Sequence, residues 1–292
     1  MYPLPSPSAS SGKSSRLGRK ISGQILIYAI LGIALFCVAY PFLVLLYGSL
    51  KSEADFLANP LSVPTVPHFE NYVYAWNAAQ IPKYTVNSAI VASATVFLTL
   101  TLAATASYGL SQFRFRGGRL IYLSFILLLT IPVQIYIIPL YIIVVKMRLA
   151  DNYLGLILPY TAGSLPLAVF LFRTYFDALP TDLIDAARID GCNHLRAFIH
   201  VILPLARPII ATVCIFTFVG AWNEFFLALV FIHDPNLATL PLGLQAFFVN
   251  QYQTQFPQLF ATLVVSIGPI VVVYLLLQRH FIAGLTAGAV RG

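Results

Sequence analysis

The sequence predicts an all-α membrane protein with six transmembrane helices. Hydrophobic residues make up 59% of the 292-residue chain, and charged residues only 9%, against about 25% in soluble proteins. Uncharged apolar runs also recur along the chain, each close to the ~20 residues that a helix needs to cross the hydrocarbon core. A chain this poor in charge cannot cover a water-facing surface of this size, so much of its exterior must face lipid.

The apolar runs between charged residues locate the spans. In chain order they are expected at about 24–48, 85–111, 120–145, 154–173, 208–232 and 256–278. The fifth run is broken only by Glu224. The uncharged stretch after Asp234 is too long for one helix, so its Asn- and Gln-rich first half is expected to be a loop and its second half the sixth span. Pro269 inside that span is tolerated where neighbouring helices satisfy the freed backbone groups.

The segment before the first span, residues 1–20, is rich in Ser and Pro and is expected to be disordered. The apolar run behind it is too long for a signal peptide and lacks an A-x-A cleavage site. We therefore predict an uncleaved first helix.

The distribution of Lys and Arg predicts the orientation. If the N-terminus is cytoplasmic, only four of the 17 basic residues fall outside: Lys51, Lys83, Lys146 and Arg148. Cytoplasmic loops carry the excess of Lys and Arg, so both termini are expected in the cytoplasm. The basic residues lie in short gaps between apolar runs, and no basic face interleaved with aromatics appears. Membrane topology therefore explains the net charge better than nucleic-acid binding.

No motif predicts catalysis by this chain. The stretch Gly12-Lys13-Ser14 resembles the end of a phosphate-binding loop, but the first glycine, the preceding strand and the following soluble helix are missing. The chain is therefore not expected to hydrolyse ATP itself. The histidines are scattered and the three cysteines have no ligand spacing, so neither a metal site nor a catalytic constellation is predicted.

The loop between the fourth and fifth spans, 174–207, carries the most informative pattern. Pro180 and Asp182 predict the start of a short helix, with Asp185 also near its positive end. Gly191 suits the end of that helix. Its apolar side is formed by three residues: Leu183, Ile184 and Ala187. Such a helix suits insertion into a groove of a partner protein, although the pattern alone favours an ordinary amphipathic connector.

This loop resembles the EAA loop of ABC importer permeases, written EAA-x3-G-x9-I-x-LP. The corresponding residues are Asp185, Ala186 and Ala187 for EAA, Gly191 for the glycine, Val201 for the isoleucine, and Leu203 and Pro204 for the final pair. Asp for Glu and Val for Ile are conservative departures. The shorter acid keeps the charge but withdraws it by one methylene group.

Other stretches resemble the carbohydrate-uptake branch of this family, in particular the smaller membrane subunit of maltose-type systems. They are residues 69–72, 87–88, 222–225, 239–244 and 284–290. The resemblance extends over roughly residues 21–292.

The resemblance implies a type I ABC importer permease fold in the bacterial cytoplasmic (inner) membrane. It implies import of an oligosaccharide or related sugar, with a second homologous permease subunit, two ATPase subunits that bind ATP and Mg²⁺, and an extracytoplasmic sugar-binding protein. This chain would itself hold no cofactor. Coupling to the ATPase is implied for Asp182, Asp185, Ala186, Ala187, Gly191, Leu203 and Pro204. The alternative, a stand-alone secondary transporter or channel, would need coupling-ion sites or inverted repeats, and we see neither.

Polar residues inside the predicted spans are candidates for the substrate path. Glu224 is the only acid within a span, and an ionisable group there is a functional-site candidate by default. With Trp222 and Asn223 it offers the aromatic surface and hydrogen bonds that suit a sugar ring. A polar clamp between helices or a gate contact is an equal alternative. Two weaker candidates, each more often a helix-packing contact, are Gln134 and Asn87.

Overall fold

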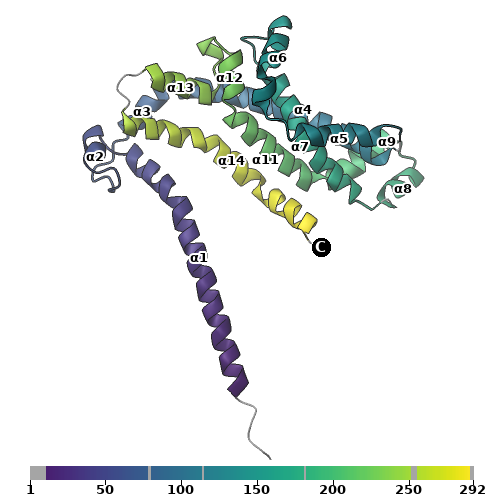
Figure 1. Cartoon of the computed structure of the whole chain (residues 1–292), viewed down its shortest axis with the longest axis horizontal. Coiled ribbons are helices and arrows are strands. Elements are labelled where there is room, and N and C mark those ends of the chain that lie inside the picture. Colours follow the sequence, from purple (N-terminus) through teal and green to yellow (C-terminus); the bar gives the residue numbers. More distant parts are fainter. Residues whose placement is uncertain (1–10, 78–79, 114, 181, 251–254, 290–292) are drawn as a thin grey trace, which may run out of the picture. The chain divides into compact units, whose positions relative to one another are not determined.

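The computed structural model describes residues 11–77, 80–113, 115–180, 182–250 and 255–289, and this part of the chain contains helices but no strand (Figure 1). The chain divides into two compact units. One comprises residues 1–71 with 255–261, and the other comprises residues 72–254 with 262–292.

The first unit is built on α1 (Ser11–Ser49), whose side chains between Leu26 and Tyr40 are mostly exposed. We expect disorder over residues 1–20 from the sequence, but residues 11–20 form the first turns of α1. Residues 1–10 lie outside the described part. The short α2 (Glu53–Ala58) follows, with Ser52 as its N-cap. The Lys51 ammonium is buried and donates to the Asn59 and Pro60 carbonyls and to the Ser62 hydroxyl. These bonds satisfy the buried cation.

The second unit is organised around α4 (Ile81–Gln112), α7 (Leu154–Asp177) and α11 (Arg207–Asn223), which pack against one another (Figure 1). Small side chains on α4 allow the close approach to α7. Among them, the Ser107 hydroxyl donates to the Val169 carbonyl at 3.1 Å. Small residues and interhelical hydrogen bonds are how helices associate in lipid, where apolar burial drives little.

The remaining helices lie before, between and after these three. They are α3 (Glu70–Asn77), α5 (Gly118–Leu128), α6 (Val133–Lys146), α8 (Asp182–Ile189), α9 (His194–Ala197), the π-helical η1 (Phe198–Ile202), α10 (Leu203–Leu205), α12 (Phe226–Phe231), the 3₁₀ turn η2 (Pro235–Leu237), α13 (Leu240–Asn250) and α14 (Phe256–Ala289).

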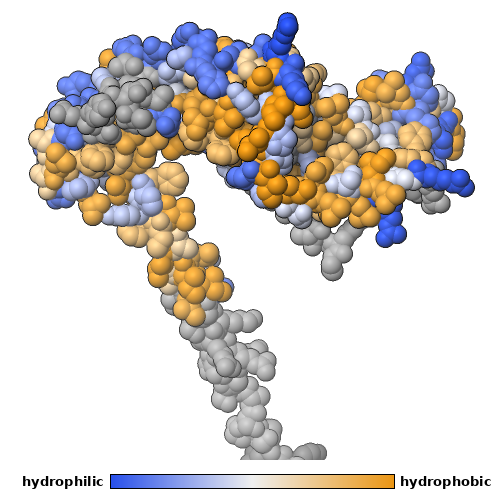
Figure 2. Space-filling view, turned by 45° about the horizontal axis from the view of Figure 1, so that its top comes forward, coloured by the Kyte–Doolittle hydropathy of each residue, from blue (hydrophilic) through white to orange (hydrophobic). Residues whose placement is uncertain are grey.

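Four helices of the described part are long and apolar enough to cross a membrane: α1 from Leu26, α4, α7, and α14 as far as Leu276. Two bent pairs raise the number to six if each pair counts as one span. The pair α5 and α6 bends by 106°, and the helical segment 194–205 meets α11 at 77°. Six spans therefore fit the described part of the chain. Figure 2 shows hydrophobic side chains over much of the visible helical surface, with hydrophilic ones around α8 and α9.

Two predicted spans are not continuous helices. The third is broken between Leu128 and Val133, where Pro132 lacks the N–H group that would continue the ladder. The fifth ends at Asn223, because Glu224 is extended (φ −68°, ψ 121°) and α12 starts two residues later. The expectation of Glu224 inside a continuous helix was wrong in this respect. Its own carboxylate accepts the first amides of α12, which replaces the helical hydrogen bonds locally.

Candidate functional site

The helix predicted in the loop between the fourth and fifth spans is α8. Ile184 and Ala187 are buried, at 7% and 5% exposed, and Ile184 joins a core that includes Phe176 and Phe198. The apolar side of the helix, which the sequence suggested for a partner's groove, is thus occupied by the chain's own core. The outward side is formed by five exposed residues: Asp182, Asp185, Ala186, Arg188 and Ile189. Ile189 is 86% exposed.

Gly191 terminates α8 as the sequence predicted. Its φ of +79° is the left-handed conformation that glycine adopts without strain. The Gly191 amide donates to the Arg188 carbonyl, and the Cys192 amide donates to the Ala187 carbonyl. These two bonds form a Schellman motif, which satisfies the last carbonyls of the helix.

The segment after α8 is held by aromatic side chains from the ends of α4 and α7. The Tyr108 ring lies 4.7 Å from the Phe198 ring, centroid to centroid, and its hydroxyl donates to the His194 carbonyl. The Tyr175 hydroxyl donates to the Leu205 carbonyl at 2.7 Å. The segment 182–206, which we call the α8–α10 loop, is therefore attached to the same core as the spanning helices.

Leu203 and Pro204, the final pair of the motif, lie at the bend between this loop and α11. Proline cannot donate the amide that would continue an α-helix, and the chain accommodates it with the π-helical η1, in which the Leu203 amide reaches the Phe198 carbonyl. A bend of 77° follows before α11. The α8–α10 loop therefore does not continue along the axis of α11.

At the opposite end of α4, Asn87 is buried at 5% exposed. Its side-chain amide donates to the carbonyls of Asn236 and Ala238, both at 2.9 Å, and its oxygen accepts from the Tyr153 hydroxyl at 2.7 Å. The neighbouring Ser88 hydroxyl accepts the Leu240 amide. Asn87 therefore fastens the segment before α13 to α4 and α7.

Asp151 adds a second fastening at this end. It lies between α6 and α7 and accepts the backbone amides of His233 and Asp234. These two hydrogen bonds to the ionised form hold the pKa of the Asp151 carboxyl below its ordinary value. Because the folded-state pKa is depressed, this contribution to stability is present at neutral pH and is lost only as the pH falls below the ordinary range of an aspartate.

Glu224 bridges three helices. Its carboxylate accepts the Leu227 and Ala228 amides at the start of α12 and the Tyr160 hydroxyl of α7 at 2.7 Å. The side chain thus connects α7 to the break between α11 and α12.

The other path candidates differ in exposure. Trp222 is 2% exposed and stacks on Phe218, whereas Asn223 is exposed, with its amide group bonded to the Val219 carbonyl. Gln134 is exposed in the first turn of α6, beside the break after α5. The three polar candidates lie on different elements: Asn87 on α4, Gln134 on α6 and Glu224 at the break after α11.

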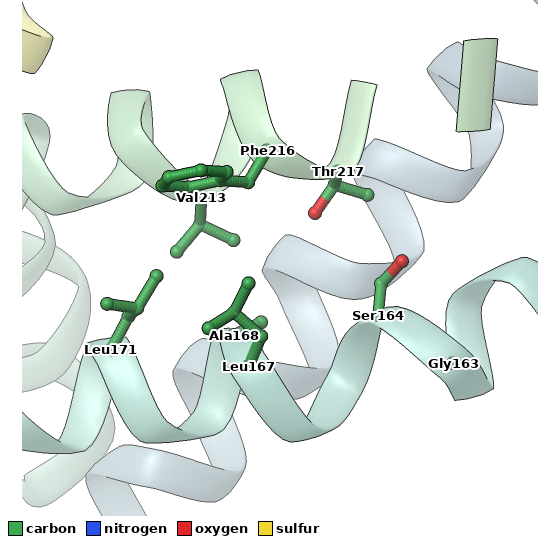
Figure 3. Close-up of a pocket in the computed structure, with 8 residues that line it drawn as sticks. All are labelled: Gly163, Ser164, Leu167, Ala168, Leu171, Val213, Phe216 and Thr217. Atoms are coloured by element: carbon green, nitrogen blue, oxygen red, sulfur yellow. The ribbon is translucent and has the colours of Figure 1, made fainter. Parts of the chain in front are cut away.

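A cavity of about 190 Å³ lies between α7 and α11 (Figure 3). Its polar groups are the hydroxyls of Ser164 and Thr217, and apolar side chains such as Leu167 and Val213 form the rest of its wall. None of the residues selected from the sequence lines it. Ser and Thr are common in membrane helices, so the sequence did not single out Ser164 and Thr217 as site residues. The packing of α7 against α11 brings these two side chains together.

No group of three or more His, Cys, Asp or Glu side chains that could hold a metal occurs among the described residues.

Sequence reasoning missed three tyrosines whose hydroxyls make hydrogen bonds at these sites: Tyr108, Tyr153 and Tyr160. In an apolar run, the sequence does not distinguish a tyrosine that only packs from one whose hydroxyl makes a hydrogen bond.

Comparison with known proteins places this geometry in a family. Residues 99–286 match the family described as "Binding-protein-dependent transport system inner membrane component". The chain is 39% identical over 255 residues to the diacetylchitobiose uptake system permease protein NgcG of Streptomyces coelicolor, covering 87% of this chain and 84% of that protein. It is 33% identical to the trehalose/maltose transport system permease protein MalG of Thermococcus litoralis, covering 92% and 96% of the two chains.

A solved structure supports the fold. The chain superimposes on a chain of a bacterial ABC transporter involved in the import of the acidic polysaccharide alginate, with a TM-score of 0.79 and 23% identity, covering 94% of this chain and 100% of that one. The prediction of an ABC importer permease fold is confirmed.

Proposed function

Because the chain belongs to the family of binding-protein-dependent transport system inner membrane components, we propose that it is the permease subunit of an ATP-driven importer that carries a saccharide into the cytoplasm. The named purposes of its relatives support a saccharide: one takes up diacetylchitobiose, another arabinooligosaccharides, and a third trehalose and maltose. These relatives match the chain over most of their length.

The observation that carries the mechanism is the two-sided character of α8. On its inner side Ile184 and Ala187 are buried, and Ile184 belongs to the core formed with α4, α7 and α11. Its outer side presents two acids, the base Arg188 and the exposed Ile189. An exposed helix with a charged and apolar surface suits a groove in a partner, and the proposed partner is an ATPase subunit.

A helix attached in this way moves with the spanning helices. When ATP closes the ATPase pair, a displacement of α8 passes to α11 through the packed core instead of being absorbed in a flexible loop. Packed cores switch between discrete arrangements more readily than they deform. The proposed outcome is alternation between inward-facing and outward-facing packings of the helices.

The assembly that follows has this chain beside a second homologous permease subunit, with two ATPase subunits that bind ATP and Mg²⁺ and an extracytoplasmic binding protein that delivers the sugar. A second permease is supported by the break between α5 and α6, where residues 127–132 and Gln134 are exposed within an apolar pair of helices. Such a break is tolerated at membrane depth only where protein or water covers it. Both termini are proposed to be cytoplasmic, from the distribution of Lys and Arg.

Within the path, Asn223 and Gln134 are proposed to meet the sugar, because both are exposed. Glu224 is proposed to position Asn223 by fixing the break at the end of α11. Trp222 and Asn87 are proposed to shape the helices that line the path, since both side chains are buried.

The test of docking is Asp185→Lys. Reversing an exposed charge that faces a partner places like charges together, which costs several kcal/mol at an interface, so ATPase recovered with the affinity-purified chain should fall at least tenfold. The matched control is Asp190→Lys, since Asp190 is also exposed but lies beyond the last turn of α8. Equal ATPase recovery from wild type and Asp185→Lys would contradict docking through α8.

The importer itself is tested by purifying the wild-type chain from its native membranes in mild detergent. Recovery of an ATPase and a second permease, with ATP-dependent sugar uptake in vesicles, is the expected result. Sugar uptake by the chain alone, without nucleotide, would instead establish a stand-alone transporter.

A further inference from the structure

A basic hollow lies where α4 ends, α5 begins and α7 ends. Its volume is about 520 Å³, and three arginines line it: Arg116, Arg119 and Arg173. It is separate from the outward side of α8 and from the candidates for the sugar path, because it shares no residue with either.

Arg173 is held in a fixed position within the hollow. Its guanidinium carbon lies 3.9 Å from the centroid of the Tyr122 ring, and its Nε lies 3.4 Å from a carboxylate oxygen of Asp177. Its Nη1 is buried and has no hydrogen-bond partner among the described residues. A buried donor left without a partner is costly.

Arg116 and Arg119 are exposed, and neither makes an ion pair or hydrogen bond within the described ranges. They flank Gly117, whose φ of +93° turns the chain into α5. Gly117 offers no capping side chain, so the first amides of α5 add positive potential at the same place. Of the three arginines that line the hollow, Arg173 has a carboxylate partner, Asp177. Among the described residues, the two positive charges of Arg116 and Arg119 are therefore left for an anion to satisfy.

The surface beside the hollow is apolar and continues along α5. Leu120, directly after Arg119, is 73% exposed, and Leu127, two turns further on, is 64% exposed. A phospholipid carries both a phosphate group, which arginines bind, and hydrocarbon chains, which an apolar surface binds. We propose that this hollow binds the phosphate of an anionic phospholipid, with the acyl chains lying along the exposed side of α5.

The physical reason for this ligand is that basic pockets between helices near the membrane surface bind acidic headgroups, with about 1 kcal/mol for each Lys or Arg. That figure corresponds to about a fivefold change in affinity per charge. The inference needs only that the chain lies in a membrane and does not depend on which solute it carries.

The experiment is native mass spectrometry of the full chain with its copurified subunits, delipidated and then titrated with phosphatidylglycerol or phosphatidylcholine. Wild type should retain phosphatidylglycerol preferentially. The double variant Arg116→Gln/Arg119→Gln should bind it about 25-fold more weakly, whereas Arg116→Lys/Arg119→Lys should keep most of the affinity. The control is Arg148→Gln, in the turn between α6 and α7, which should leave retention unchanged.

Several results would overturn the proposal. They are equal retention of the two lipids by wild type, an equal loss in Arg148→Gln, and displacement of the lipid by inorganic phosphate at the lipid's own concentration, which would mark a site for free phosphate. Loss of a protein subunit with unchanged lipid retention would identify a protein contact instead. If the glutamine variant fails to assemble, the wild-type titration at rising salt decides, since retention by guanidinium groups must fall with ionic strength.

Discussion

The two ends of α4 are held in different ways. At the α8–α10 loop, the contacts are mostly apolar: Ile184, Phe198 and Ile202 are buried with Phe172 and Tyr108 in one core. At the other end, side chains and backbone are joined by hydrogen bonds: Asn87 donates to two carbonyls and Ser88 accepts the Leu240 amide. Asp151, between α6 and α7, accepts the Asp234 amide at the same end.

The difference matches two mechanical roles. Apolar packing is spread over many contacts and resists partial opening, which suits a loop that must carry a displacement to the spanning helices. Hydrogen bonds to backbone are few and directional, so they can exchange with water or with a ligand one at a time. We therefore expect a substitution in the α8–α10 loop to loosen the whole loop at once. At the opposite end, we expect a substitution to loosen only the segment whose hydrogen bond is lost.

The strongest way to break this comparison is Phe198→Ala. Phe198 is 6% exposed and touches Tyr108, and removing a buried phenyl ring costs about 3–5 kcal/mol. We expect faster hydrogen exchange across the whole α8–α10 loop and ATP hydrolysis that no longer drives uptake. Leu195→Ala is the control, since Leu195 is 63% exposed in the same loop. If hydrogen exchange rose only in the turn around residue 198, the α8–α10 loop would not move as one unit.

At the opposite end, the corresponding change is Asn87→Leu. It removes hydrogen bonds to the Asn236 and Ala238 carbonyls and to the Tyr153 hydroxyl, and unpaired buried groups cost about 1–3 kcal/mol. Thermal unfolding should shift, and exchange should rise in residues 233–240 while the α8–α10 loop stays protected. Lys83→Met, which deletes only the exposed bond to Asn236, should have little effect. Raised exchange in both regions would count against their independence.

Glu224→Gln tests the break between α11 and α12. The amide retains one acceptor but presents a donor group toward the amides of Leu227 and Ala228, so we expect a loss of about 1 kcal/mol, as for a weakened cap. Assembly should survive, while sugar uptake changes. Tyr160→Phe, which removes a single bond to Glu224, is the comparison variant. Unchanged uptake kinetics in Glu224→Gln would leave the residue a packing contact.

The smallest expected effect is that of Gly191→Ala. A Cβ at Gly191 would meet nothing within 4 Å, so the cost is that of the left-handed backbone alone, about 1 kcal/mol. Hydrogen exchange at the end of α8 should rise slightly, and Gly191→Asn should lie closer to wild type, because asparagine tolerates this conformation. A larger loss for Gly191→Ala would mean that a partner approaches this turn closely.

Local pattern was sufficient for much of this protein. The length of apolar runs predicted where α1, α4, α7 and α14 lie, since a span needs a minimum length of hydrocarbon contact. The pattern from Asp182 to Gly191 predicted both ends of α8, because helix starts and stops depend on residues within one turn.

Only the tertiary structure decided which side of α8 is free and which polar groups are already occupied. Asn87 meets Ala238 across 151 residues, and Tyr160 meets Glu224 across 64. Periodicity reports which residues share a helix face, but not which helix covers that face. The composition thus determined that this chain lies in a membrane, whereas the hydrogen-bond partners of the Asn87 amide and the Glu224 carboxylate depend on how α4, α7 and α11 pack.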